Sequence, residues 1–216
     1  MPTFLLIRHG ENEYVAKGRL AGRLPGVHLN ENGKKQAEAV ANAFMKAPIK
    51  AIYASPMERC LQTAEPLAAT LGLEINANQG LIEVDFGSWQ DKTLKQLRRR
   101  KLWKVVQANP SRVQFPDGET FASAQQRIVQ TLESLTKEFE SKDLIACFSH
   151  SDLIKLAVSY YLGQPIDLFQ RIMIAPASVS TLHLGEMGAQ VINVNHGVDN
   201  LSFPQHKSKP KKKPKS

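Results

Sequence analysis

Cysteines and long apolar runs are the features that this sequence has least of. Its 216 residues include two cysteines, Cys60 and Cys147, and no Cys-x-x-Cys pair. A disulfide scaffold and a cysteine-based metal site are therefore disfavoured, and we expect two buried thiols that stay reduced. No apolar run approaches the roughly 20 residues that a transmembrane helix needs. The start Met1-Pro2-Thr3 has neither a basic stretch nor a small-residue cleavage site, so we expect a cytoplasmic protein without a membrane anchor.

Acidic residues are missing from the end of the chain, and this gap explains most of the net charge of +8. Residues 206–216 hold six lysines, whereas the rest of the chain has 22 Lys and Arg side chains against 20 Asp and Glu. A Lys-Pro-Ser segment cannot bury enough apolar surface to form a core, so we expect residues 204–216 to be a disordered tail. Such a tail either promotes solubility or makes weak, nonspecific contacts with nucleic acid or other anions. Residues 1–203 would then form one domain.

The rest of the chain alternates short apolar segments with amphipathic ones, which is typical of an α/β domain. The last two apolar segments are separated by four residues, so we expect them to pair as an antiparallel hairpin. The sequence therefore predicts a three-layer α/β/α sandwich with a mixed, mostly parallel central sheet. Strands are expected at 4–7, 51–54, 143–148, 179–184 and 189–194, and helices at 30–46, after Ser55-Pro56, and at 91–107, 121–140 and 153–162.

Two histidines follow apolar strands at the point where each strand ends. Arg8-His9-Gly10 comes directly after Phe4–Ile7, and Ser149-His150 follows the strand at 143–148. Ligands of open α/β sheets bind beyond the carboxyl ends of the strands, so both histidines are candidates for a site there. A histidine in this position is alternatively a hydrogen-bonded loop residue without a catalytic role.

Three further segments carry charge near predicted element ends. Arg59 lies in the first turn of a helix, where its side chain and the helix N-terminus can face one anion, although a salt-bridged surface role is the alternative. Glu83 and Asp85 lie two residues apart in a short apolar segment, and one of them can face a cleft. The basic run Arg98–Lys101 is either a solvated helix face or a rim that attracts anionic substrates.

These segments together resemble the histidine phosphatase superfamily, in its phosphoglycerate-mutase-like branch. The resemblance covers about residues 3–195 and rests on four motifs in a fixed order. They are Arg8-His9-Gly10-Glu11; Ser55-Pro56 with Arg59 and Thr63-Ala64; Leu81 with Glu83 and Gly87; and Ser149-His150. A narrower resemblance to phosphomutase-like members lies in residues 20–27 and 151–155. The resemblance implies the phosphoglycerate-mutase-like form of the three-layer sandwich.

The resemblance also implies roles for individual residues. His9 would attack phosphorus and become a phosphohistidine, while Arg8, Arg59 and His150 would surround the phosphoryl oxygens. Glu83 would act as the general acid and then as the base that activates water. Asn12, the backbone of Gly22 and Ser151 would complete the binding of a small phosphorylated substrate. Neither a metal nor another cofactor is expected, because the cationic side chains supply the charge.

Departures from the family pattern bear on which reaction is catalysed. Val15 and Ala21 stand where relatives often have a hydrogen-bonding side chain. Glu83-Val84-Asp85-Phe86 replaces the Glu-Arg-x-Tyr of true mutases, and Ser151-Asp152 replaces Gly-Asn, which removes partners for a substrate carboxylate. We therefore expect a phosphomonoester hydrolase that forms a phosphohistidine. A phosphoglycerate-mutase-type phosphomutase is the alternative, and a catalytically silent phosphate-binding protein is the second.

Overall fold

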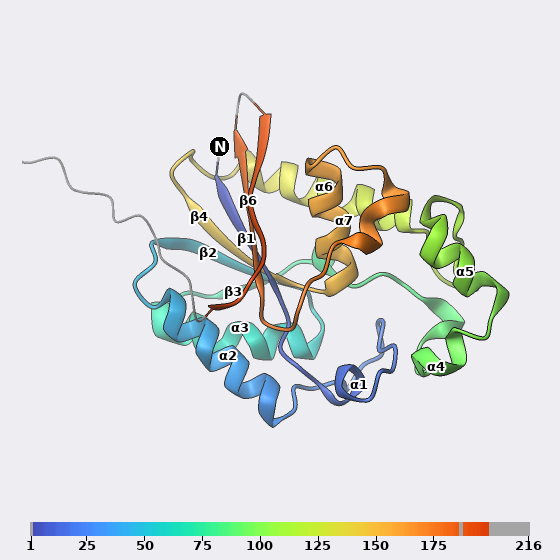
Figure 1. The fold of residues 1–216 in the computed structure, drawn as a ribbon. Coiled ribbons are helices and arrows are strands. Elements are labelled where there is room, and N and C mark those ends of the chain that lie inside the picture. The colour runs from blue at the N-terminus through green and yellow to red at the C-terminus, as the bar shows by residue number, and fades with distance from the viewer. Residues whose placement is uncertain (1, 186–187, 199–216) are drawn as a thin grey trace, which may run out of the picture.

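A six-stranded sheet forms the centre of the protein in a computed structural model, which describes residues 2–185 and 188–198 (Figure 1). The strand order is β3-β2-β4-β1-β5-β6, and β1 to β4 run parallel while β5 and β6 join as antiparallel strands. The predicted mixed, mostly parallel sheet is therefore confirmed, including its closing hairpin. The strands are β1 Thr3–Arg8, β2 Ile49–Ala54, β3 Ile75–Ala77, β4 Leu144–Ser149, β5 Val179–Gly185 and β6 Gly188–His196.

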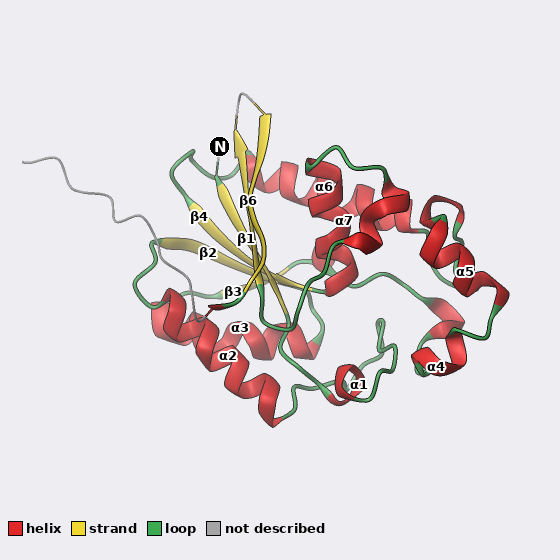
Figure 2. Cartoon of the chain, in the orientation of Figure 1, coloured by secondary structure: helices red, strands yellow, loops and turns green. Residues whose placement is uncertain are grey.

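Helices cover both faces of the sheet and complete the three layers (Figure 2). Leu5 and Ile7 of β1 pack in a core with α2 and α3, whereas Phe4 and Leu6 pack in a second core with α6 and α7. β1 is thus apolar on both faces because both faces are buried. The helices are α1 Glu13–Ala16, α2 Glu31–Phe44, α3 Glu58–Leu71, α4 Leu94–Leu97, α5 Lys101–Ala108, α6 Phe121–Thr136 and α7 Ser151–Tyr161.

The prediction of one long helix at 91–107 is wrong, since this segment forms the two short helices α4 and α5. Thr93 caps α4 in a reciprocal capping box with Gln96, so the first helix starts later than its polar sequence suggested. Arg100 has an extended backbone and begins α5 as a separate helix. Apolar periodicity continues across this break, which is why the sequence pattern did not reveal it. The short edge strand β3 was not predicted either.

The segment that holds Glu83 and Asp85 is extended and lies outside the sheet. Short 3₁₀ turns enclose it, at Gln79–Leu81 before it and at Gly87–Trp89 after it. Two more 3₁₀ turns, Pro110–Arg112 and Ile166–Arg171, connect the helices of the second core. The Glu83 segment is therefore held between two turns rather than by strand pairing.

The expected basic tail at 204–216 lies outside the described residues, and so does the boundary at residue 203. Cys60 and Cys147 are free and buried, as predicted. Within the described residues, none of the helices has the length and apolar character that crossing a bilayer requires.

Candidate active site

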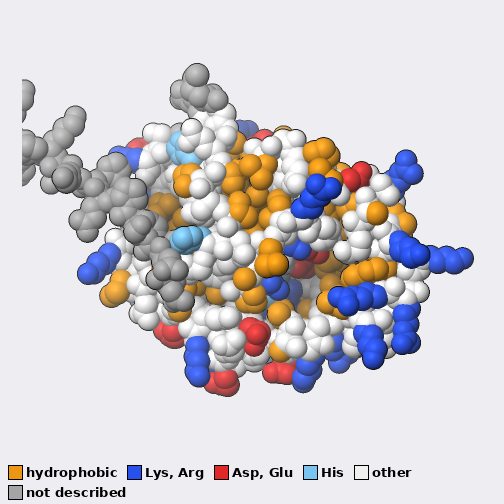
Figure 3. Space-filling view, in the orientation of Figure 1, with side chains coloured by type: hydrophobic (Ala, Val, Ile, Leu, Met, Phe, Trp, Pro, Cys, Tyr) orange, Lys and Arg blue, Asp and Glu red, His pale blue; other side chains and the backbone are white. Residues whose placement is uncertain are grey.

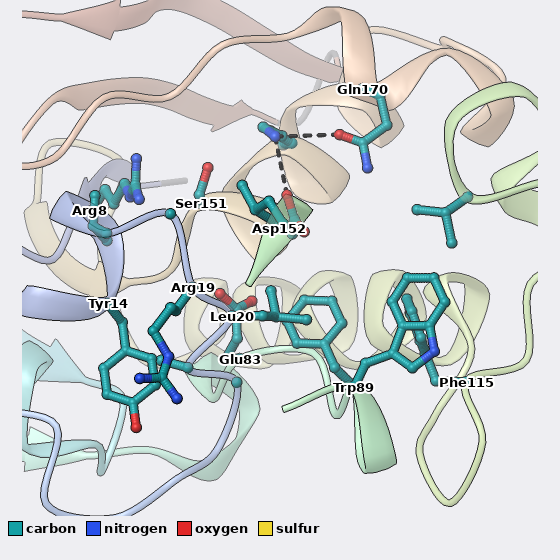
Figure 4. Close-up of a pocket in the computed structure, with 18 of the residues that line it drawn as sticks. Arg8, Tyr14, Arg19, Leu20, Glu83, Trp89, Phe115, Ser151, Asp152 and Gln170 are labelled. Carbon is teal, nitrogen blue, oxygen red and sulfur yellow. Dashed lines mark hydrogen bonds and ion pairs between the residues drawn. The ribbon is translucent and has the colours of Figure 1, made fainter. Parts of the chain in front are cut away.

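The carboxyl ends of three neighbouring strands meet at one cavity (Figure 4). Arg8 at the end of β1 is in register with Ser149 at the end of β4, and β2 lies on the other side of β4. The loop after β1, the α4–α5 segment and the start of α7 close the remaining walls of a cavity of about 330 Å³. This is the edge at which the sequence predicted a site.

His9 lies at this edge with one ring nitrogen fixed and the other free. Its Nδ1 lies 2.7 Å from the carbonyl oxygen of Gly10, and a carbonyl can only accept, so Nδ1 carries the proton. Burial, together with the charges of Arg59 and Arg8, holds the pKa of His9 well below its usual value. The ring is therefore neutral, and its Nε2 has a lone pair. A neutral imidazole in this state is a nucleophile.

The backbone of α2 passes close to Gly10, so no larger residue fits directly after His9. A β-carbon at Gly10 would lie 2.6 Å from the carbonyl oxygen of Gly33, the backbone of α2. The Gly10 N–H also donates to Thr63 Oγ1 at 3.0 Å, which ties the loop after β1 to α3. These contacts fix the backbone of His9, whose own N–H donates to the Ser149 carbonyl. The position of the imidazole is thus set by backbone contacts on three sides.

Five buried N–H donors on side chains that line the cavity have no partner among the described residues. One is Arg19 Nε; the other four, which belong to predicted site residues, are Arg8 Nε, Asn12 Nδ2, Arg59 Nε and Arg59 Nη1. Unpaired buried donors cost free energy, and two of these side chains are cationic, so the arrangement suits a tetrahedral dianion.

The side chains that carry these donors are fixed by their other polar atoms. Arg8 Nη1 donates to the Ile174 carbonyl at 2.7 Å, and Arg59 Nη2 donates to the Gly22 carbonyl at 2.7 Å. Asn12 caps α1 by accepting the Val15 N–H. The donors without partners are therefore held in place by the protein itself.

His150 is fully buried and does not line the cavity. Its Nδ1 accepts from Arg59 Nη2 at 3.1 Å, so Nε2 carries the proton and donates to Ser55 Oγ at 2.8 Å. Burial and the charge of Arg59 lower the pKa of His150 well below its usual value, which agrees with this neutral tautomer. The rings of His150 and His9 are 5.3 Å apart between centroids. His150 thus contacts Arg59 and lies behind it.

Glu83 projects into the cavity, and Asp85 does not line it. Burial raises the pKa of Glu83 to about 7, with the charge of Asp152 as the second cause. Figure 4 shows the carboxylates of Glu83 and Asp152 pointing into the same space. Asp85 instead accepts the Gly87 N–H and faces Arg23. Of the two acids that the sequence left open, Glu83 is the one at the cavity.

The predicted site residues lie together, with His150 as the one behind the wall. Gly22 has a left-handed backbone with φ of 55°, and a β-carbon there would collide with Gln90. Its carbonyl already accepts from Arg59. Ser151 begins α7 and donates weakly to the Ile174 carbonyl at 3.4 Å. The predicted site residues that line the cavity are Arg8, His9, Asn12, Gly22, Arg59, Glu83 and Ser151.

Sequence reasoning missed the network that supports Glu83. Glu119 Oε1 accepts from Arg23 Nη2 at 2.7 Å, from Arg127 Nη2 at 2.8 Å and from the Asp85 N–H at 2.9 Å. Arg23 Nε donates in turn to the Glu83 carbonyl. The hydrogen-bonded partners are up to 96 residues apart in the chain, and no spacing in the sequence signals their contact.

The basic run Arg98–Lys101 is exposed on the outside of the α4–α5 segment and does not line the cavity. Lys and Arg side chains gather over this part of the molecule (Figure 3). This favours a solvated face over direct contact with a substrate. In residues 2–185 and 188–198, no group of three or more His, Cys, Asp or Glu side chains is arranged to hold a metal ion.

Comparisons with known proteins place this fold and site in a family. The curated phosphoserine phosphatase 1 of Hydrogenobacter thermophilus is 28% identical over 197 residues, which cover 90% of this chain and 92% of that protein. A 2,3-bisphosphoglycerate-dependent phosphoglycerate mutase of Thermoplasma acidophilum is 29% identical over 162 residues, covering 75% and 77%. The structure of a mutant phosphoserine phosphatase of Entamoeba histolytica in complex with phosphoserine superposes with a TM-score of 0.83 at 28% identity, covering 93% and 100%.

The family profile named histidine phosphatase superfamily (branch 1) matches residues 4–197. Apart from Thr3, the first residue of β1, this range includes all the strands of the sheet and every side chain of the cavity described above. The chain belongs to the histidine phosphatase superfamily.

Proposed function

We propose that this protein is a phosphomonoester hydrolase that acts on a small phosphorylated metabolite through a phosphohistidine at His9. One observation carries the proposal: a neutral histidine with a free Nε2 lies beside four buried donors that have no partner among the described residues. A phosphoryl group bound by those donors would be held next to the nucleophile. The family membership and the phosphatase relatives support the same reaction.

In the first step, the His9 Nε2 lone pair attacks phosphorus in line with the ester oxygen. The N–P bond forms as the P–O bond to the leaving group breaks, and Glu83 gives its proton to the departing alkoxide oxygen. A carboxyl group with a pKa of about 7 is partly protonated at neutral pH, which suits an acid in this step.

In the second step, water attacks the phosphorus of the phosphohistidine. Glu83, now ionised, takes a proton from that water, the N–P bond breaks, and inorganic phosphate leaves. His9 recovers its lone pair and Glu83 its proton, so the cycle is balanced without another reactant.

Fixed positive charge would stabilise the transferring phosphoryl group. Arg8 and Arg59 would bind the equatorial oxygens with planar guanidinium donors, and Asn12 Nδ2 would add a neutral one. The carbonyl of Gly22 accepts from Arg59 and, as an acceptor, would not bind a phosphoryl oxygen. His150 would act as a positioning residue, since its Nδ1 accepts from Arg59. Ser151 would bind at the edge of the phosphoryl site.

Replacement of His9 tests the proposal directly. The His9→Ala protein should lose turnover and should accumulate no acid-labile, base-stable label from a phosphorylated substrate. His28→Ala is the matched control, because His28 is exposed, hydrogen-bonds to Gln62 and does not line the cavity. Label that still accumulated on the His9→Ala protein would show that another residue is the nucleophile.

A phosphomutase is the second candidate function, favoured by the phosphoglycerate mutase among the relatives. Isomerisation of a phosphoglycerate that depends on added bisphosphoglycerate would establish it, whereas release of inorganic phosphate would establish the hydrolase. A silent phosphate-binding protein would bind phosphate and catalyse neither reaction. The retention of His9, Glu83 and both arginines speaks against that reading.

Two expectations concern the whole protein. We propose that it acts in the cytoplasm, because the sequence contains no apolar segment of membrane-spanning length. We also propose that the lysines of residues 204–216 make weak contacts with anionic surfaces or nucleic acid. Retention of the full chain on heparin or DNA that falls steeply with salt, and that a chain ending at residue 203 lacks, would support the second expectation.

A further inference from the structure

The cavity continues beyond the phosphoryl site into a space that we call the outer chamber. Figure 4 shows Leu20, Trp89 and Phe115 on the far side of Glu83 from Arg8. Because Glu83 would protonate the leaving oxygen, the group attached to that oxygen would lie in this chamber. The side chains that line the outer chamber are Leu20, Phe86, Trp89, Leu94, Trp103, Val106, Phe115 and Phe121.

The wall of the outer chamber is apolar and rigid. The rings of Trp89 and Trp103 stack with centroids 6.2 Å apart and an interplanar angle of 19°. Trp89 packs edge to face on Phe115 at 5.3 Å, and Phe115 on Phe121 at 5.2 Å. Trp89, Phe115 and Phe121 line the chamber and are otherwise buried, whereas Trp103 is half-buried. Such a wall is preformed for apolar contact.

The charged side chains beside the outer chamber already have partners. Lys155 Nζ lies 3.0 Å from Asp152 Oδ1 and 3.4 Å from Gln170 Oε1. Arg19 Nη2 contacts both the carboxylate and the carbonyl of Asp91. Arg19 Nε is a buried donor without a partner among the described residues, so one N–H remains for an oxygen atom of the leaving group.

Binding a charged group at Lys155 or Asp152 would require breaking the pair that they form. Both members of the Lys155–Asp152 pair are largely buried, with side-chain exposures of 15% and 21%. Separating a largely buried pair leaves one charge uncompensated, which is unfavourable. An apolar group would instead displace water from an aromatic wall and leave both pairs intact.

We infer that the preferred substrates of this enzyme are monoesters with an uncharged apolar leaving group, alkyl or aryl, rather than phosphorylated amino acids or carboxylic acids. The inference rests on the proposed function, since it assumes that the ester phosphate occupies the site of Arg8, Arg59 and His9. It differs from what the relatives' names indicate for those proteins, because the outer chamber here has an apolar wall and its charges are paired.

A series of linear alkyl phosphates tests the inference without changing the chemistry of the leaving oxygen. From ethyl through butyl to hexyl phosphate, kcat/KM should rise by up to about fourfold per methylene, the value for full burial of a CH₂ group. Propyl phosphate should be hydrolysed with a higher kcat/KM than phosphoserine, which has the same number of carbons and a better leaving group. A flat series, or a preference for phosphoserine or phosphoglycerate, would overturn the inference.

Trp103→Ala should flatten the chain-length series by removing half of the stacked pair. Phe139→Ala is the matched control, because Phe139 packs on Tyr53 and is not part of the cavity wall. Leu94→Ser probes the same wall with a smaller change and keeps the test open if the tryptophan variant does not fold. If neither wall variant changes the slope in a folded protein, the apolar wall does not contact the leaving group.

Alkylphosphonates separate this inference from the proposed function, since they bind but cannot be hydrolysed. If their affinity, measured by calorimetry, rises with chain length while no monoester is turned over, the outer chamber is supported and the hydrolase is not. If monoesters are hydrolysed but phosphonate affinity is independent of chain length, the hydrolase is supported and the inference about the leaving group is wrong.

Discussion

The two ends of the cavity differ in the groups that line them. At the inner end, Arg8, Arg59 and Asn12 present buried donors that have no partner among the described residues, an arrangement that suits an anion. At the outer end, Arg19 and Lys155 each contact a carboxylate, Arg19 keeps one unpartnered Nε donor, and the wall is aromatic. One end is therefore built for charge and the other for apolar surface.

Glu83 lies between these two ends. Its carboxylate is buried, and the nearby charges act on it in opposite directions: Asp152 favours the protonated form, and Arg59 and Arg8 favour the ionised form. An acid that must give up a proton in one step and take one in the next needs this balance. A substitution at the inner end should therefore slow the hydrolysis of all substrates, whereas the effect of a substitution at Glu83 should depend on the leaving group.

Glu83→Gln should have the largest leaving-group dependence. Hydrolysis of alkyl esters should slow by about 10²- to 10⁴-fold, because the alkoxide can no longer be protonated as it departs. Nitrophenyl phosphate should be affected less in the phosphorylation step, since its leaving group needs little protonation. Burst and steady-state rates for both substrate types measure the difference.

Asp85→Asn is the matched control for this experiment, because Asp85 is two residues away and contacts Arg23 and Gly87. The leaving-group dependence should be absent in this variant. If Asp85→Asn showed it and Glu83→Gln did not, Asp85 would be the acid.

Arg59→Ala should slow every monoester by about 10²- to 10³-fold, the usual effect of losing a preorganised donor to transition-state charge. Alkyl and aryl esters should be affected equally, because Arg59 lies at the inner end. Arg59→Lys should recover only part of the rate, since a point charge cannot replace Nε and Nη1 together. A loss confined to one class of leaving group would mean that the two ends are not separable.

Several parts of this arrangement were predictable from the sequence. An apolar strand that ends in Arg8-His9-Gly10 predicts a polar cluster at the sheet edge, and the second strand–histidine unit predicts its neighbour. The motif order then placed Arg59 and Glu83 at the same edge, where the structure has them. Arg8, His9 and Arg59 lie together because strand ends in a parallel sheet converge, whereas the position of Glu83, outside the sheet, followed only from the motif order.

Other parts were not predictable, because they depend on contacts between distant segments. Burial of His150 behind Arg59 depends on how α3 packs against the end of β4. The outer chamber combines Leu20 with residues between 86 and 121, and the break between α4 and α5 shapes its opening. From the sequence alone, apolar side chains that line a cavity in those segments cannot be distinguished from side chains of the hydrophobic core. The tail at 204–216 and the boundary before it stay predictions.

The free energy of unfolding should depend on pH through Glu83. Burial raises its pKa from the ordinary value of 4.5 to about 7 in the folded protein. Its stabilising contribution is therefore present below pH 4.5 and lost as the pH rises through about 7. The Gln side chain of Glu83→Gln is neutral at every pH. At pH 8 the free energy of unfolding of this variant, measured with urea, should therefore exceed that of the parent by about 1–3 kcal/mol.

At pH 4.5 the same substitution should change the unfolding free energy little, since both side chains are then neutral. Asp85→Asn controls for the loss of a nearby carboxylate that does not line the cavity. An equal effect of Glu83→Gln at both pH values would show that the carboxyl group is not held in its protonated form by the fold.

Asp152→Asn should have the smallest effect, a shift in pH dependence. Removing the Asp152 charge takes away the second cause of the raised pKa of Glu83, while burial, the first cause, stays. The alkaline limb of the kcat/KM profile for an alkyl ester should move to lower pH, by up to about one unit. Lys155→Gln should move it the other way, because Asp152 then loses the cation 3.0 Å away that offsets its charge. If both variants moved the limb in the same direction, or neither moved it, the charge of Asp152 would not act on Glu83. Burial alone would then raise the pKa of Glu83.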